Sequence, residues 1–388
     1  MNRWQIAFGK LALTLEMPAD AQLCFDFLNA YFCGYCEFNL CPTEISALVH
    51  IQVYLGTSTE VLDFGQVQPV LIDGSKDFLR CTARQIRANS HQVWSWLEPF
   101  SVTACVDTAT RVIRVWGPTP KALRVPLLRI IEDLFLNEIQ RNRGIIVHAS
   151  GVVADGRSTL VLGNKGAGKS SLLVKLLQNF DVQKLANDNV CLQLEKDEMT
   201  VQGWPAFMKL CAGTVATHRE LVHDFPEQAR TVLDNDAELW AVYEKIPLYP
   251  SQAAERFATR LAASAPLGAV ILPRFTTSLP GRLSIANYTD LASELRLCLQ
   301  GMFNPNHSEW LHLNPADRDQ VLASCDEIAR WISRARIPVY YLDWGVSLGD
   351  LLLKINELRP ASKLLRACRL STRKQESWPD LPKIADVQ

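Results

Sequence analysis

"VLGNKGAGKSSLLVKLL", at positions 161–177, decides the fold of the second half of this chain. The stretch fits the P-loop pattern G-x-x-x-x-G-K-[ST]. The fixed positions of that pattern are held by Gly163, Gly168, Lys169 and Ser170. A β-rich run precedes the motif (158–163), and leucines at helical spacing follow it (169–180). A plain glycine-rich turn is the alternative, and the full motif at a strand-to-helix junction argues against it.

A P-loop wraps a phosphate chain with its own amide N–H groups, so side chains near it must be small or absent. Glycine also allows the unusual φ angles of such a nest. The helix that follows points its N-terminus, with its free N–H groups and dipole, at the phosphates. We expect Lys169 to reach the β- and γ-phosphate oxygens and Ser170 to bind Mg²⁺. The predicted nucleotide-binding residues are Gly163, Asn164, Lys165, Gly166, Ala167, Gly168, Lys169, Ser170 and Ser171.

Composition and charge narrow the classes of protein that fit the chain. Its 388 residues are enough for two domains, and 48% hydrophobic with 21% charged residues is typical of a globular protein. The net charge of −1 does not suggest a nucleic-acid partner. No apolar run approaches the ~20 residues of a membrane span, and the first residues do not read as a secretory signal. These features favour a cytoplasmic protein without membrane contact.

The 11 cysteines are an odd number and lie mostly in apolar stretches, as expected of reduced, buried thiols. One cluster, "CFDFLNAYFCGYCEFNLC", holds Cys24, Cys33, Cys36 and Cys41. Cys33-x-x-Cys36 is half of a metal site or a redox pair in some proteins. No second C-x-x-C and no H-x-x-x-H follows, so packing in the core is the favoured interpretation and a metal site the alternative.

Hydrophobic periodicity predicts an α/β protein. In the first part, strand-like runs at 47–56 and 68–74 precede a hairpin at 101–107 and 111–117, and a helix is expected at 118–142. Further on, strands are predicted at 144–156, 182–195, 266–275 and 337–345, and helices at 234–247, 290–303, 315–334 and 347–358. We expect an accessory α/β domain at 1–120, a second domain at 121–358 and a loosely ordered tail at 359–388.

Two further residues are candidates for chemistry beside the P-loop. Asp188, in "LANDNV", follows the strand after the P-loop helix and is placed to bind Mg²⁺ or to act as a base. Asn-Asp-Asn also favours a β-turn, and the two interpretations are compatible. His148 lies on the strand that precedes the P-loop strand. A core histidine is the ordinary explanation there, but a proton-handling role is open because the pKa of histidine lies near neutrality.

"HASGVVADGRSTLVLGNKGAGKSSLLVKLLQNFDVQKLANDNV" resembles the core of the bacterial HPr kinase/phosphorylase family. The resemblance covers residues 144–192 well. More loosely, "VQGWPAFMKLCAGTV", "AELWAVYEKIPLY" and "IPVYYLDWG" resemble the HPr kinase-related proteins called related kinase B. The resemblance implies a P-loop kinase fold, related to phosphoenolpyruvate carboxykinase, and the use of ATP and Mg²⁺. By position, Lys169 holds phosphates, Ser170 holds Mg²⁺, Asp188 is the base or a metal ligand, and His148 lines the site.

The chain departs from that family in two ways. The acidic pair of the family is Asn187-Asp188 here, so one carboxylate remains, and the role that Asp188 keeps stays open. The later Glu-x-x-Gly signature is absent, so phosphorolysis is not implied. Related kinases assemble into hexamers, which makes a homo-oligomer an expectation.

Other P-loop classes fit less well. A signalling GTPase would carry N-K-x-D as a base-reading motif, whereas "NK" here lies inside the P-loop itself. An ABC or AAA ATPase would carry acidic Walker B residues after an apolar strand, whereas "GAVILPRF" ends in Pro273-Arg274. The sequence therefore predicts a kinase that moves the γ-phosphoryl group of Mg-ATP to a hydroxyl of a protein, a peptide or a small molecule. The alternative is an ATP-binding switch or slow ATPase without an acceptor.

Overall fold

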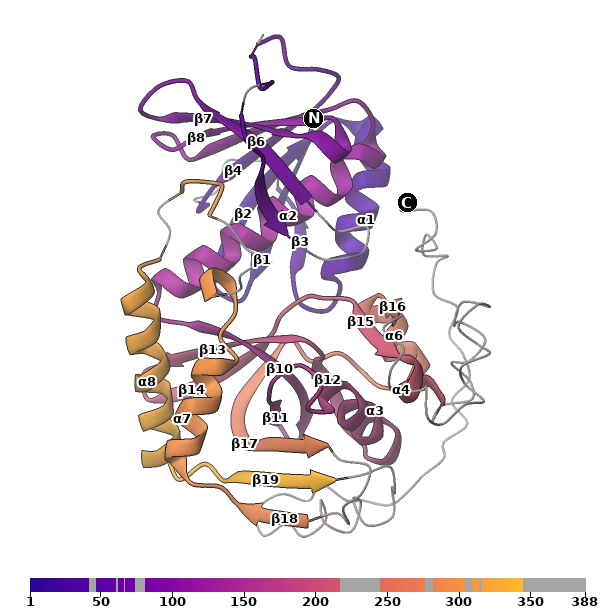
Figure 1. The fold of residues 1–388 in the computed structure, drawn as a ribbon. Coiled ribbons are helices and arrows are strands. Elements are labelled where there is room, and N and C mark those ends of the chain that lie inside the picture. Colours follow the sequence, from indigo (N-terminus) through magenta and orange to yellow (C-terminus); the bar gives the residue numbers. More distant parts are fainter. Residues whose placement is uncertain are drawn as a thin grey trace. The chain divides into compact units, whose positions relative to one another are not determined.

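The structure is a computed structural model that describes residues 1–41, 47–60, 62–65, 67–73, 81–216, 245–275, 282–303, 309–313 and 316–344. These ranges form a mixed α/β structure with three β-sheets (Figure 1). The chain divides into two compact units. Within the described residues, unit 1 comprises 1–145 and 300–322, and unit 2 comprises 146–299 and 323–344. None of the described helices combines the length and the apolar character that crossing a membrane requires.

Unit 1 is built on a nine-stranded sheet with the order β3-β1-β2-β4-β9-β8-β7-β6-β5. Its neighbouring strands are antiparallel except at β2–β4 and β4–β9, which are parallel. The strands are β1 (Asn2–Phe8), β2 (Leu11–Met17), β3 (Glu37–Leu40), β4 (His50–Leu55), β5 (Val70–Asp73), β6 (Cys81–Arg87), β7 (Gln92–Leu97), β8 (Val102–Asp107) and β9 (Val112–Gly117). Short 3₁₀ helices η1 (Ala19–Ala21) and η2 (Glu98–Phe100) connect some of them.

Helices α1 (Gln22–Phe32) and α2 (Pro120–Arg141) pack on this sheet and against each other. The ring of Phe135 in α2 lies 5.4 Å from that of Phe8 in β1. The Tyr31 hydroxyl of α1 donates to the Glu132 carboxylate of α2 at 2.9 Å. Alternating residues of β4 and β9 are buried, which gives this sheet the apolar layer that the helices cover.

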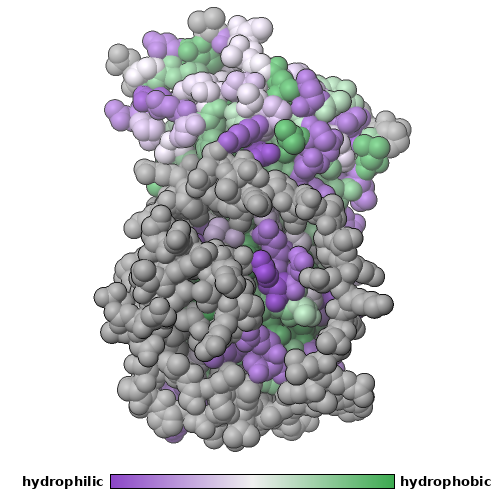
Figure 2. Space-filling view, turned by 90° about the vertical axis from the view of Figure 1, so that its right-hand side faces the viewer, coloured by the Kyte–Doolittle hydropathy of each residue, from purple (hydrophilic) through white to green (hydrophobic). Residues whose placement is uncertain are grey.

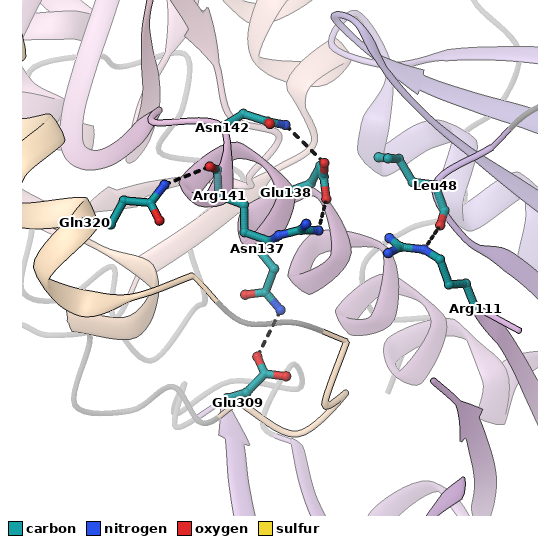
Figure 3. A network of polar contacts seen from close by, with 8 residues as sticks. All are labelled: Leu48, Arg111, Asn137, Glu138, Arg141, Asn142, Glu309 and Gln320. Atoms are coloured by element: carbon teal, nitrogen blue, oxygen red, sulfur yellow. Dashed lines mark hydrogen bonds and ion pairs between the residues drawn. The ribbon is translucent and has the colours of Figure 1, made fainter. Parts of the chain in front are cut away.

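A later part of the chain also belongs to unit 1, because polar contacts hold it to the end of α2 (Figure 3). The Asn137 amide donates to the Glu309 carboxylate at 2.9 Å. The Gln320 amide, near the start of α8 (Arg318–Arg334), donates to the Arg141 carbonyl at 2.9 Å. The indole N–H of Trp310, which is fully buried, donates to Asp133. The 3₁₀ helix η5 (Gly301–Phe303) opens this segment.

Unit 2 contains an eight-stranded sheet with the order β11-β10-β13-β14-β17-β19-β18, in which β12 pairs with β10 and β11 also pairs with β17. A separate two-stranded sheet joins β15 and β16. The strands are β10 (Ile145–Ala154), β11 (Arg157–Leu162), β12 (Gln183–Ala186), β13 (Asn189–Glu195), β14 (Glu198–Gly203), β15 (Met208–Cys211), β16 (Lys245–Leu248), β17 (Ser264–Phe275), β18 (Arg282–Ile285) and β19 (Val339–Trp344). The helices are α3 (Lys169–Asn179), α4 (Ala212–Ala216), α6 (Pro250–Arg256), α7 (Tyr288–Leu297) and the rest of α8.

The core of unit 2 forms around α3. The predicted leucine stripe of this helix is buried and shares one apolar cluster with β15, α4, α6 and β19. The stripe consists of Leu172, Leu173, Leu176 and Leu177. This packing fixes the start of α3 against the sheet, and the site at that start depends on it.

Several local predictions are confirmed. β8 and β9 form the predicted hairpin, whose turn is held by the Asp107 carboxylate accepting the N–H groups of Ala109 and Thr110 at 3.1 Å. The helix predicted at 118–142 is α2, which the Thr119 hydroxyl caps by accepting the N–H of Ala122 at 3.2 Å. Pro126 lies inside this helix.

Two expectations differ from the structure. The helix predicted at 234–247 is wrong at its end, because residues 245–248 form strand β16, which pairs with β15. Pro247 lacks the N–H that a helix interior needs, and pairing with β15 decides the conformation. The rest of that helix, the helix at 347–358 and the tail lie outside the described residues. Unit 1 extends to Ile145 and includes α2, whereas the boundary was expected after residue 120.

Candidate functional site

The P-loop is a strand-turn-helix, as predicted. β11 ends at Leu162, the loop runs through 163–168, and α3 begins at Lys169. The N–H of Ala167 bonds the carbonyl of Asn164 at 3.1 Å and closes a tight turn. Residues 164–166 are exposed, and the Ser170 and Ser171 side chains lie in the first turn of α3. The loop therefore presents its backbone, with the exposed Asn164, Lys165 and Gly166, to an approaching group.

Two glycines of the loop adopt left-handed conformations. Gly166 has φ +88° and Gly168, the residue that caps α3, has φ +85°. A Cβ added at Gly166 meets nothing within 4 Å, so backbone conformation rather than space requires glycine there. Successive N–H groups in such a turn converge into the anion-binding nest that precedes a helix N-terminus.

Lys169 folds back over this loop. Its ammonium donates to the carbonyls of Gly163 at 2.7 Å and Asn164 at 3.0 Å, and the residue is 6% exposed. Burial is the largest cause of the lowered pKa of Lys169. Asp188 and Cys298 oppose the change, the charge of Lys245 adds to it, and the resulting pKa is about 8. A largely buried cation beside the N–H groups of the loop is a strong binding group for an anion.

Strand directions bring His148 and Asp188 to the same edge of the sheet as the P-loop. β10 is antiparallel to both β11 and β12, so the end of β11, the end of β12 and the beginning of β10 coincide. Ala149, next to His148, faces Leu162 at the end of β11. The N–H of Ala149 also bonds the carbonyl of Asp188 at 3.0 Å, which fixes the turn between β12 and β13.

His148 and Asp188 form a pair. The Nδ1 atom of His148 lies 3.2 Å from Oδ1 of Asp188, with 24% of the histidine side chain and 48% of the aspartate side chain exposed. Burial lowers the pKa of His148. The charge of Asp188 opposes this change, and the positive charges of Lys169 and Lys245 add to it. The imidazole is therefore neutral at pH 7, and its Nδ1–H can donate to the carboxylate. The pair presents an accessible carboxylate oxygen whose orientation the histidine holds.

Asn187 is buried, unlike the adjacent Asp188. It is 6% exposed, its amide donates to the carbonyl of Phe207 at 3.0 Å, and its own carbonyl accepts the hydroxyl of Ser150 at 2.8 Å. At a turn, successive side chains point in different directions, so Asp188 faces outward while Asn187 anchors the segment before β15. Asn187 therefore anchors the backbone before β15 and does not share the exposed position of Asp188.

This arrangement gives a stability prediction. Asn187→Asp is expected to lower the free energy of unfolding by roughly 2–4 kcal/mol at pH 8, because a buried carboxylate replaces the donor to a carbonyl. Burial raises the pKa of the new carboxyl, so the folded state binds more protons than the unfolded state and the loss shrinks as the pH falls toward 5. Urea unfolding at both pH values measures this, with Asn39→Asp, at an exposed position on β3, as the neutral control. Equal midpoints for Asn187→Asp and the native chain would contradict the structural role.

Three residues that contact the candidate site, Cys298, Thr214 and Lys245, were not predicted from the sequence. Cys298, which follows α7, accepts the N–H of His148 on its carbonyl at 2.7 Å, and its buried thiol lies 4.0 Å from the Asn164 side chain. Burial raises the pKa of this thiol to about 11, so it is neutral. The hydroxyls of Ser171 and Thr214 are 2.8 Å apart, and Lys245 acts electrostatically on Lys169 and His148. All of these join segments that are far apart in sequence.

The cysteine cluster of unit 1 gives no support to a metal site. Cys24 and Cys41 are buried, whereas Cys33 and Cys36 are partly buried. In the part of the chain that the structure describes, no three His, Cys, Asp or Glu side chains are grouped as metal ligands. Burial raises the pKa of the Cys24 thiol to about 12, as in a packed, inert thiol.

Comparison with known proteins gives little additional information. No protein-family model matches the chain, and no curated protein matches its sequence. Among solved structures, the HPr(Ser) kinase/phosphatase from Coxiella burnetii is similar at a TM-score of 0.25 with 12% identity over 55% of this chain and 96% of that chain. A similarity of this size carries no argument, so the functional conclusion depends on the site itself.

Proposed function

We propose that this protein is a P-loop kinase that transfers the γ-phosphoryl group of Mg-ATP to a hydroxyl acceptor. The observation that supports it most is the shared edge: the glycine nest and Lys169 lie beside an exposed carboxylate that a neutral histidine orients. The glycine loop and Lys169 suit a phosphate chain, and the Asp188–His148 pair suits an acceptor hydroxyl. Figure 2 shows the molecule from the right-hand side of Figure 1, where α3 and β15 lie. Hydrophilic residues (purple) are exposed in the middle of that face.

The residues present also fit magnesium. Mg²⁺ is held in such sites by one or two carboxylates, a hydroxyl and the phosphates of the substrate, rather than by a cage of protein ligands. Ser170, in the first turn of α3, and the exposed carboxylate of Asp188 are donors of this kind. When bound, the ion neutralises charge on the phosphate oxygens.

In the proposed reaction, Lys169 exchanges its two carbonyl acceptors for oxygens of the β- and γ-phosphates. The acceptor oxygen forms a bond to the γ-phosphorus while the bond from that phosphorus to the bridging oxygen breaks, and ADP leaves. The proton of the acceptor hydroxyl passes to the Asp188–His148 pair. Asp188 faces the acceptor, and His148 positions it through the 3.2 Å contact.

A switch or slow ATPase without an acceptor is the second candidate. It is favoured by the lone carboxylate, since Asn187 points into the structure. Incubation of the protein with γ-labelled ATP and fractionated cell extract, including small metabolites and proteins, separates the two. Label that moves to a protein, a peptide or a small molecule supports the kinase. Release of all label as free phosphate, in every fraction, favours the switch.

The pKa of Lys169 makes nucleotide binding depend on pH. Above pH 8 its ammonium loses the proton, while a bound phosphate raises the pKa, so the Kd for Mg-ATP should rise by up to about tenfold per pH unit between pH 8 and 9.5. Lys169→Arg stays charged over this range, so its Kd should be flat whatever its absolute value. Calorimetric titration at four pH values measures both slopes. Equal slopes in the two proteins would contradict the assignment of the titrating group.

A further inference from the structure

Lys245 is an exposed cation whose place is fixed by the small sheet of unit 2. It is the first residue of β16 and lies directly opposite Cys211, the last residue of β15. β15 and β16 lie beside α3 (Figure 1). Met208, Leu210 and Leu248 of this sheet are buried in one apolar cluster with the leucines of α3. The backbone that carries Lys245 is therefore packed onto the helix that begins at the P-loop.

Two hydrogen bonds hold β15 to the site from both of its ends. Just before the strand, the carbonyl of Phe207 accepts the amide of Asn187, the neighbour of Asp188, at 3.0 Å. Just after it, the hydroxyl of Thr214 lies 2.8 Å from that of Ser171, in the first turn of α3. Cys211 and its partner Lys245 come between these two anchors, so Lys245 is placed beside the phosphate-binding turn and the Asp188 turn together.

The electrostatics agree with this placement. Burial is the main cause of the lowered pKa values of Lys169 and His148, and the charge of Lys245 adds a smaller lowering to both, so its ammonium lies within electrostatic reach of the two groups. Among the described residues, two ammonium groups and a neutral imidazole lie near one carboxylate, Asp188, and Cys298 is a neutral thiol. These described groups carry an excess positive charge, which suits a polyanion better than a neutral ligand.

The geometry points to Lys245 as a binding residue for the terminal phosphoryl group of the nucleotide triphosphate. This inference depends on the proposed function. The nest and Lys169 hold the β- and γ-phosphates, whereas Lys245 approaches from the side of the His148–Asp188 pair, where the γ-phosphoryl group meets its acceptor. Charge spreads over the equatorial oxygens of that group during transfer, and a second cation there stabilises it. Lys245 takes no proton in this step.

The test compares a diphosphate with a triphosphate. Mg-ADP and the magnesium complex of a non-hydrolysable ATP analogue are titrated calorimetrically into the full chain and into Lys245→Gln, Lys245→Arg and Lys196→Gln. Lys245→Gln should bind the triphosphate roughly 10- to 100-fold more weakly, as expected for a lost charge-assisted hydrogen bond, and ADP within about threefold of the native chain. Lys245→Arg should retain most of the triphosphate affinity. Lys196, on the exposed turn between β13 and β14, is the charge-matched control and should change neither affinity.

The outcomes separate this inference from the proposed function. If the native chain binds neither nucleotide, the proposed function fails and Lys245 has no ligand of this kind. If the native chain binds both and Lys245→Gln binds both equally well, the nucleotide site stands and the role of Lys245 is refuted. Equal weakening for ADP and the triphosphate also refutes it, because the contact is then not to the terminal group. Thermal unfolding of each variant checks the fold, which the exposed position of Lys245 should preserve.

Discussion

Lys169→Ala is expected to weaken Mg-ATP binding by roughly 100-fold or more and to abolish phosphoryl transfer. The ammonium of Lys169 is buried at the mouth of the loop, where each hydrogen bond to a phosphate oxygen is charge-assisted and desolvated. Neighbouring Asp188 carries the opposite charge, so without Lys169 the phosphates also meet an unbalanced carboxylate. Calorimetric titration with Mg-ATP measures the loss of affinity, and γ-labelled ATP measures the loss of transfer.

The matched control is Lys196→Ala, which removes the same charge from an exposed turn of unit 2 and should change neither affinity nor turnover. Lys169→Ala also removes the donors to the Gly163 and Asn164 carbonyls, so its thermal unfolding is compared with that of the native chain. A Lys169→Ala protein that is folded and turns over ATP at the native rate would rule out this loop as the phosphate site.

The strand, loop and helix of the candidate site could be predicted from the sequence because the signals there are local. The motif places its glycines and Lys169 within seven residues, and the apolar runs on both sides define the strand and the helix. The positions of His148 and Asp188 beside it also follow from sequence order, since adjacent strands of a sheet meet at shared edges. The orientation of the Asp188 carboxylate does not follow from strand order. It is seen only in the structure, where His148 contacts it at 3.2 Å.

The rest depends on contacts between distant segments. Lys245 looked helical in its own neighbourhood, and pairing with β15 makes it a strand residue beside the P-loop. Cys298 has no motif around it, and its place next to Asn164 follows from how α7 ends. Asn187 and Asp188 are equally polar and adjacent, so the sequence could not show that one anchors Phe207 while the other is exposed. The later segment that contains Glu309 and Gln320 belongs to unit 1 through contacts with Asn137 and Arg141 of α2, which are far away in sequence.

Asp188→Asn is expected to leave Mg-ATP binding nearly unchanged and to slow transfer to the acceptor by roughly 10²- to 10⁴-fold, the usual contribution of a positioned acid-base group. Asparagine preserves the size and turn propensity of the residue, but it cannot take the proton of the acceptor hydroxyl. The carbonyl of residue 188, which bonds Ala149, is unaffected by the change, so the turn should keep its shape. Single-turnover transfer of labelled phosphate, once the acceptor is in hand, measures the effect.

Comparison with His148→Ala decides how the pair works. If His148 only positions Asp188 through its Nδ1 contact, His148→Ala should slow transfer much less than Asp188→Asn, and the double variant should be no slower than Asp188→Asn alone. If the imidazole itself takes the proton, the two single variants should be equally slow. The Mg²⁺ dependence of the rate shows whether Asp188 is a metal ligand or a base. Replacing a metal ligand raises the Mg²⁺ concentration needed for half-maximal rate, whereas replacing a base does not. A native rate of transfer to the acceptor in Asp188→Asn would remove this residue from the reaction, although the protein would still be a kinase.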